Sequence, residues 1–227
     1  MPNELLWLMF LLLDLSSVVL FYRLFGKSGL YAVIVMSSII CNMQVVKLVN
    51  VFGFVATLGN IVYASNFLAT DILSEIYGKR DARKGVWMGF GTLIVATIWM
   101  QMALLFKPAP EDFADPHLRA IFTLMPRITF ASLTAYLLSQ FHDVWAYHFW
   151  KEKTHGKHLW LRNNASTMVS QAIDTLVFTT IAFLGVVDLK TFGSIVLTTY
   201  FLKWLVAIFD TAFIYMAKFI GERYDLN

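Results

Sequence analysis

The sequence predicts an all-α membrane protein, a polytopic helix bundle that forms a single transmembrane domain over residues 1–227. Of the 227 residues, 58% are hydrophobic and only 15% are charged, and the mean hydropathy is +0.64. This leaves too few polar side chains to cover the surface of a water-soluble domain. The apolar residues are gathered in runs of about 20, the length that a helix needs to cross roughly 30 Å of hydrocarbon. Together these observations exclude an ordinary soluble protein.

Seven stretches are long and apolar enough to span a bilayer. We interpret the first as a span and not as a signal peptide, because it lacks a basic beginning and a small-residue cleavage site. The break between the second and the third is the weakest, and only Lys47 and Gly53 favour it. The connections are short except for the proline-rich segment 107–126. The expected spans are residues 5–25, 29–49, 53–76, 84–106, 127–150, 165–187 and 192–218.

Basic residues predict the orientation of the chain, because Lys and Arg are enriched in cytoplasmic loops. The connections after the first, third and fifth spans, together with the segment after the seventh, hold twelve of them. The connections on the other side hold five. We therefore expect the amino terminus outside and the carboxyl terminus in the cytoplasm.

The sixth span begins with a polar stripe. Asn163, Thr167, Ser170, Gln171 and Asp174 follow one another at steps of one, three or four residues, so their side chains lie along one face of a helix. The last of them is about ten residues into the span and hence near the middle of the bilayer. An ionisable side chain at that depth is costly and indicates function. We expect the protein to act through this face.

Two further charged residues lie inside other spans. Lys203, in the seventh span, lies at about the same depth as Asp174. An acid and a base at one depth on different helices predict either an ion pair or a shared ligand, and the sequence leaves both open. Asp14, in the first span, is expected to pair with another helix, and for it a structural role is favoured over a role in transport.

The third span ends in two acids on one helix face, Asp71 and Glu75, next to a face that carries Asn66. For Glu75, near the cytoplasmic end, we favour hydration or pairing with Lys79 and Arg80. For Asp71, one turn deeper, a functional role is favoured. Both expectations follow from one principle: an unpaired charge inside the membrane is costly, so it is either paired, hydrated or functional.

A second polar stripe lies along the fifth span at steps of three and four residues, preceded by Arg127. It consists of Thr129, Ser132, Tyr136, Gln140, Asp143 and Tyr147. In the second span, Asn42 lies near the middle, and packing between helices and ligand binding are equally supported for it. In the fourth span, Gly85, Gly89 and Gly91 predict close approach of a neighbouring helix.

Four histidines close together in the sequence do not form a metal-binding pattern. His142 and His148 are six residues apart, on opposite helix faces, and His155 and His158 lie in a basic loop that repels cations. We expect no metal and no cofactor. Cys41, the single cysteine, excludes an internal disulfide. The net charge of +3 gives no indication of nucleic-acid binding.

Four short sequence motifs occur in order along these spans. They are Asn66-Phe-Leu-Ala-Thr-Asp71 ahead of Tyr77-Gly78, Gln140 with Asp143-Val144, Ser166-Thr167 with Asp174-Thr175, and Lys203. Together they resemble the VUT family of queuosine precursor transporters over about residues 35 to 220. The resemblance implies uptake across the inner membrane of 7-cyano-7-deazaguanine or 7-aminomethyl-7-deazaguanine. It also implies a six-helix core like that of the substrate-binding subunits of energy-coupling-factor vitamin transporters, preceded by one extra amino-terminal helix.

The chemistry of a deazaguanine suits polar residues in the spans. Its N1–H and exocyclic amine are adjacent donors, which one carboxylate can accept in bidentate fashion. Amides can complement the carbonyl, and aromatic rings can stack on the flat base. The expected substrate-binding residues are Asn42, Asn66, Asp71, Arg127, Gln140, Asp143, Gln171, Asp174 and Lys203.

Other interpretations stay open. A transporter of this kind could act alone or as a homodimer. The chain is also consistent with a binding subunit for another vitamin-like or nucleobase solute. A membrane-embedded enzyme that uses His142 and Asp143 is disfavoured, because no nucleophile–base constellation is present. Ser28 and Ala32 match only weakly the Ala-x-x-x-Ala motif of energy-coupling-factor subunits, so the sequence leaves energy coupling undetermined.

Overall fold

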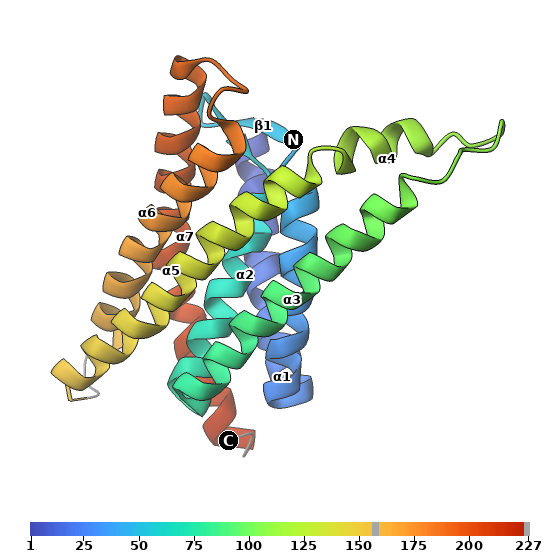
Figure 1. The fold of residues 1–227 in the computed structure, drawn as a ribbon. Helices are drawn as coiled ribbons and strands as arrows, with labels where there is room; N and C mark the ends of the chain where they lie inside the picture. Colours follow the sequence, from blue (N-terminus) through green and yellow to red (C-terminus); the bar gives the residue numbers. More distant parts are fainter. Residues whose placement is uncertain (156–158, 225–227) are drawn as a thin grey trace.

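The protein is a bundle of long helices in a computed structural model (Figure 1). The described residues are 1–155 and 159–224, without the side chains of residues 159, 161–164, 167, 191 and 207. The side chains of Asn163 and Thr167 and the whole of His158 therefore lie outside the description. The elements are α1 (Asn3–Gln44), β1 (Leu48–Val51), β2 (Phe54–Thr57), α2 (Gly59–Ile72), the π-helical turn η1 (Leu73–Tyr77), α3 (Lys79–Ala103), α4 (Asp115–Phe122), α5 (Met125–Lys153), α6 (Leu159–Phe183) and α7 (Leu189–Tyr224).

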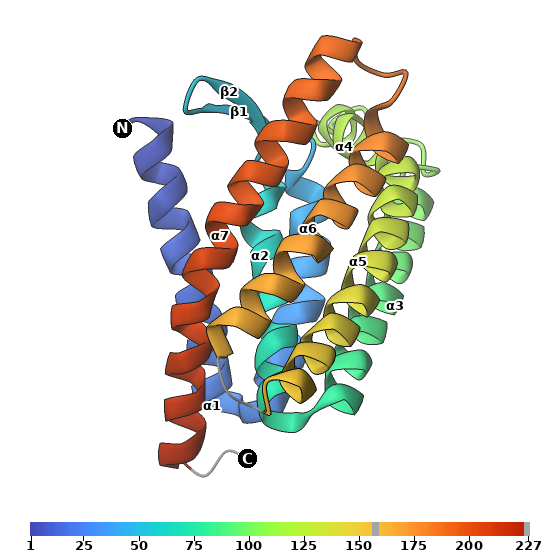
Figure 2. The same ribbon diagram turned by 90° about the vertical axis from the view of Figure 1, so that its left-hand side faces the viewer.

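Helix α1 consists of two arms. Its backbone leaves the helical conformation at Gly26, with φ 57° and ψ −138°, a left-handed conformation that glycine adopts without a Cβ penalty. The arms on either side run in opposite directions (Figures 1 and 2). Accordingly, the beginning of the first arm lies next to the β1–β2 hairpin, which follows the second arm in the sequence. Asn3 Nδ2 donates there to the carbonyl oxygen of Asn50 at 2.9 Å. The two arms correspond to the first two expected spans.

A β-hairpin separates α1 from α2. Strands β1 and β2 pair antiparallel, with Val51 opposite Phe54. The two linking residues, Phe52 and Gly53, both have positive φ, as in the type I′ turns that suit hairpins. The expected end of the second span at 49 and the expected start of the third at 53 are therefore wrong. The run of valine and phenylalanine is apolar enough for a helix, but its β-branched residues favour a strand.

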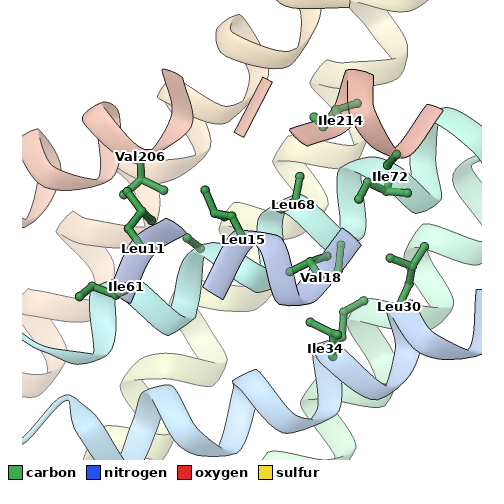
Figure 3. Packing of buried hydrophobic residues seen from close by; sticks show 14 of the residues in the cluster. Leu11, Leu15, Val18, Leu30, Ile34, Ile61, Leu68, Ile72, Val206 and Ile214 are labelled. Atoms are coloured by element: carbon green, nitrogen blue, oxygen red, sulfur yellow. The ribbon is translucent and has the colours of Figure 1, made fainter. Parts of the chain in front are cut away.

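The first arm of α1 is packed into the bundle. Figure 3 shows Leu11, Leu15 and Val18 beside residues of α2 and α7, and all three side chains are fully buried. The arm is also attached to α2 by a hydrogen bond of 2.5 Å from Ser65 Oγ to Asp14 Oδ2, which confirms the predicted pairing of Asp14 with another helix. Because lipid is as apolar as leucine, packing and such hydrogen bonds hold helices together in a membrane.

The arrangement is that of a multi-pass membrane protein. Four helices of the described part are long and apolar enough to cross a bilayer, in Asn3–Gln44, Lys79–Ala103, Asp115–Lys153 and Phe192–Tyr224, and Met168–Phe183 is a shorter apolar helix. The beginning of α1 and the end of α7 lie at opposite ends of the bundle, and α2, α5 and α7 run in the same direction (Figure 2). Large apolar side chains such as Leu13, Trp99 and Leu197 are exposed on the outside of the bundle, where they can contact lipid.

Candidate functional site

Six segments of the bundle line one small cavity, whose wall contains both polar and apolar side chains: the second arm of α1 together with α2, α3, α5, α6 and α7. It contains about 50 Å³ of free space, which is room for a few water molecules because one needs roughly 10–15 Å³ on this measure. A flat bicyclic molecule would enter only if lining side chains moved. The cavity is lined by Ser38, Cys41, Asn42, Val45, Gly59, Asn60, Tyr63, Gly89, Leu93, Ser132, Tyr136, Asp174, Phe178 and Lys203.

A buried ion pair forms one wall of the cavity. Lys203 Nζ donates to Asp174 Oδ2, and the two residues are only 4% and 3% exposed. The predicted meeting of this acid and this base is confirmed. The other carboxylate oxygen, Oδ1, accepts from Tyr63 Oη at 2.7 Å and from Ser139 Oγ at 3.3 Å. The carboxylate and its three donors come from four different helices, and the donors hold the carboxylate in one position.

The Lys203 ammonium group has a second interaction besides the ion pair. It lies 4.8 Å from the centre of the Tyr63 ring, a distance at which the ring face attracts a cation. Tyr63 therefore binds both charges, the carboxylate through its hydroxyl group and the ammonium group through its ring. Such compensation is needed, because leaving either charge buried and unpaired is strongly unfavourable.

Asn42 lies on the cavity wall formed by the second arm of α1. Its Oδ1 accepts from Ser132 Oγ at 2.5 Å, and its Nδ2 donates to the carbonyl oxygen of Ser38 at 2.8 Å. It therefore links α1 to α5 and also faces the cavity. Nearby, Asn60 Nδ2 is buried without a hydrogen-bond partner in the part of the chain that the structure describes. This amide is a donor that a ligand can use.

Glycines bring the helices around the cavity into close contact. A Cβ on Gly59 would lie 2.4 Å from the carbonyl oxygen of Cys41, and one on Gly89 would lie 2.9 Å from Ser38 Oγ. At Gly85 it would lie 2.8 Å from Ile34 Cδ1. The predicted packing role of Gly85 and Gly89 is confirmed, whereas Gly91 has nothing within 4 Å of that position.

The remaining predicted site residues lie elsewhere. Asn66 does not line the cavity but contacts Ser38, which does. Its Oδ1 accepts a hydrogen bond from Ser38 Oγ at 3.2 Å. Arg127 is at the exposed end of α5 and donates to the carbonyl oxygens of Ile181 and Leu184, both at 2.9 Å, so it caps α6. Four further candidates are buried but do not line the cavity, namely Asp71, Gln140, Asp143 and Gln171.

The structure also adds cavity residues that were not among the predicted ones. Tyr63, Tyr136 and Phe178 supply aromatic rings, and Tyr63 and Tyr136 lie 6.2 Å apart between ring centres. Ser132 and Tyr136 belong to the polar stripe of the fifth span at a spacing of four. That spacing was the available signal, since it marks one helix face.

At the opposite end of the bundle, Glu75 is the centre of a polar network. Its carboxylate oxygens lie 3.3 Å from Lys151 Nζ and 3.0 Å from Lys218 Nζ, and Tyr147 donates to it at 3.0 Å. In the described part of the chain, Lys151 and Lys218 form ion pairs with Glu75, and the expected partners Lys79 and Arg80 are not among them. These two residues begin α3 after the turn at Gly78, while α5 and α7 end beside η1. The network thus joins η1, α5 and α7.

A bundle of membrane-length helices that encloses a charged cavity is typical of proteins that move small polar solutes across a membrane. Residues 57–217 match the family model described as putative vitamin uptake transporter. The chain belongs to this family.

Curated relatives carry consistent names. A probable queuosine precursor transporter of Bacillus subtilis (strain 168) is 42% identical over 219 residues, which is 96% of this chain and 96% of that protein. A queuosine precursor transporter of Escherichia coli (strain K12) is 32% identical over 163 residues, covering 70% of this chain and 68% of that protein. The comparison with solved structures gives no match.

Proposed function

We propose that the protein takes up queuosine precursors across the cell's inner membrane, with 7-cyano-7-deazaguanine or 7-aminomethyl-7-deazaguanine as substrate. The observation that carries this proposal is the Asp174 carboxylate, held in the wall of a cavity that is also lined by aromatic rings. It is supported by the near-full-length relative named a probable queuosine precursor transporter. The names of the relatives are those of transporters, which favours transport over catalysis.

In this proposal the carboxylate recognises the guanine-like edge of the base. Asp174 accepts from N1–H and from the exocyclic amine, as a carboxylate can in bidentate fashion. The amide of Asn42 or Asn60 complements the carbonyl, and the rings of Tyr63 and Phe178 lie against the flat faces. A buried polar base without such partners would lose several kcal/mol, about 2–7 for each unpaired group.

Binding requires that the existing partners of Asp174 give way. Both oxygens are occupied in the structure, one by Lys203 and the other by Tyr63 and Ser139. The incoming donors replace some of these interactions, so recognition is an exchange of partners and not the filling of a vacant acceptor. A base without the amine leaves the carboxylate with an unpaired oxygen and binds less well.

The shape of the bundle supports uptake from the side of the amino terminus. Val45 and Gly59, which flank the hairpin, line the cavity, whereas the Glu75 network joins three elements at the other end. With the amino terminus outside and the carboxyl terminus in the cytoplasm, as the basic residues predict, the cavity is nearer to the outside. The substrate would enter next to the hairpin.

A binding experiment tests the proposal. The purified protein in detergent is examined by mass spectrometry for a copurified small molecule, and then titrated with 7-cyano-7-deazaguanine. A bound deazaguanine, or saturable binding of the added one, supports the proposal. Binding of neither, by protein that is folded by its melting curve, contradicts it. Chemical change of the bound base would instead favour the enzyme interpretation.

A further inference from the structure

The charges of the cavity wall are balanced. Among the lining residues that the structure describes, Asp174 supplies the one carboxylate and Lys203 the one ammonium group. The two form an ion pair with each other, so each is compensated by the other. The wall therefore holds no second carboxylate for a further cation.

The same wall has hydrogen-bond donors to spare. An ammonium group has three N–H donors, and within the described part of the chain the Lys203 ammonium group donates to Asp174 and lies over the Tyr63 ring. Asn60 Nδ2 is buried there without a partner. An uncharged acceptor that enters the cavity can use these donors, whereas a group that only donates cannot.

The two precursors of the proposed function differ in this respect. The nitrile of 7-cyano-7-deazaguanine is an uncharged acceptor. The aminomethyl group of the other precursor is a primary amine, which like that of lysine is positively charged at neutral pH and only donates. In both bases the substituent at C7 is next to the carbonyl, and the carbonyl is next to N1–H.

We propose that the cavity selects between the precursors by charge, taking the uncharged 7-cyano form and rejecting the cationic 7-aminomethyl form, with Lys203 as the residue that decides. This proposal rests on the proposed function, in which Asp174 reads N1–H and the exocyclic amine. The base then displaces the Lys203 ammonium group from Asp174. The carbonyl and the C7 substituent are the groups that this ammonium group meets next.

A count of charges gives the direction of the selection. With the 7-cyano form, the displaced Lys203 meets two acceptors, the carbonyl and the nitrile. With the 7-aminomethyl form, two cations share one carboxylate. Whichever of them pairs with Asp174, the other is a buried cation without a counter-charge, which is strongly unfavourable. The Tyr63 ring does not compensate the second cation, because it already lies against Lys203.

Binding of three bases to the purified wild-type protein at pH 7 tests the selection. The third base is 7-hydroxymethyl-7-deazaguanine, which has nearly the size of the aminomethyl form but no charge. We expect the aminomethyl form to bind about ten- to a hundredfold less tightly than both uncharged bases, the effect of one lost hydrogen bond between charged groups. Binding of the aminomethyl form as tight as that of the hydroxymethyl form overturns the proposal.

A pair of variants on α7 assigns the selection to Lys203. In Lys203→Met the substrate's own ammonium group can pair with Asp174, so the aminomethyl form is expected to bind at least as tightly as the hydroxymethyl form. Lys218→Met makes the same change outside the cavity and is expected to keep the wild-type ratio. A wild-type ratio in folded Lys203→Met overturns the role of Lys203.

If Lys203→Met does not fold, the wild type is measured as the pH is raised. The aminomethyl form loses its charge, so its affinity is expected to rise toward that of the hydroxymethyl form, by up to about tenfold for each pH unit below the pKa of the amine. A ratio that does not change with pH overturns the proposal. Failure of all three bases to bind to folded wild-type protein contradicts the proposed function, and the selection with it; binding without preference contradicts the selection alone.

Discussion

Replacement of Asp174 by Asn gives the sharpest test of the cavity. The amide has almost the same shape but no charge, so Lys203 is left as a cation that is only 4% exposed. Removing one partner of a buried ion pair costs about 3–5 kcal/mol. We expect Asp174→Asn to melt at a markedly lower temperature than the wild type in detergent. Loss of stability alone does not show that the residue contacts the substrate.

A double variant separates the structural role from recognition. Asp174→Asn combined with Lys203→Met removes both charges, and replacing a whole buried pair is often neutral or stabilising. We expect the double variant to regain most of the lost stability. If Asp174 reads the base, affinity for the deazaguanine stays low, because a hydrogen bond to a charged group contributes about 1.5–3 kcal/mol. That corresponds to roughly ten- to a hundredfold weaker binding.

The matched control is Asp14→Asn. Asp14 also lies inside the bundle and accepts a hydrogen bond from α2, but the described part of the chain gives it no basic partner. This variant is expected to melt closer to the wild type and to bind the deazaguanine normally. The reasoning is refuted if the stable double variant, or Asp174→Asn itself, binds the base with wild-type affinity. Asp174 and Lys203 would then only join α6 to α7.

Three further predictions follow from the same structure. A reporter that is active only in the cytoplasm should work when fused to the carboxyl terminus and fail at the amino terminus; the reverse result would contradict the orientation. Guanine should compete weakly with the deazaguanine, and adenine should bind about ten- to a hundredfold less tightly than guanine. Equal competition by the two bases would exclude recognition by a carboxylate. Gly59→Ala should destabilise the protein by about 1–3 kcal/mol, since its Cβ would lie 2.4 Å from the Cys41 carbonyl oxygen. Gly91→Ala, with open space around it, should leave the melting temperature unchanged or slightly raised.

Depth in the membrane could be predicted from the sequence, because it follows from counting residues along each apolar run. The meeting of Asp174 and Lys203, as an ion pair or at a shared ligand, was predicted in this way. The rotation of each helix about its own axis could not be predicted equally well. Asn66 and Gln171 therefore seemed as good candidates as Asn42, although only Asn42 lines the cavity.

Contacts between distant helix ends were not predictable either. Lys79 and Arg80 are the basic residues nearest to Glu75 in sequence, yet Lys151 and Lys218 bind it. The hairpin was missed for a different reason. Its residues are apolar, so hydropathy alone cannot distinguish two short strands from the end of one helix and the beginning of the next.

The polar stripe of α5 extends from the cavity toward the Glu75 network. Ser132 and Tyr136 line the cavity, and Asp143 lies two turns further along the same face. Gln140 lies between them with both side-chain polar atoms buried and unpartnered among the described residues. Buried polar atoms of this kind are satisfied by ordered water, so the polar face of α5 continues into the bundle beyond the residues that line the cavity.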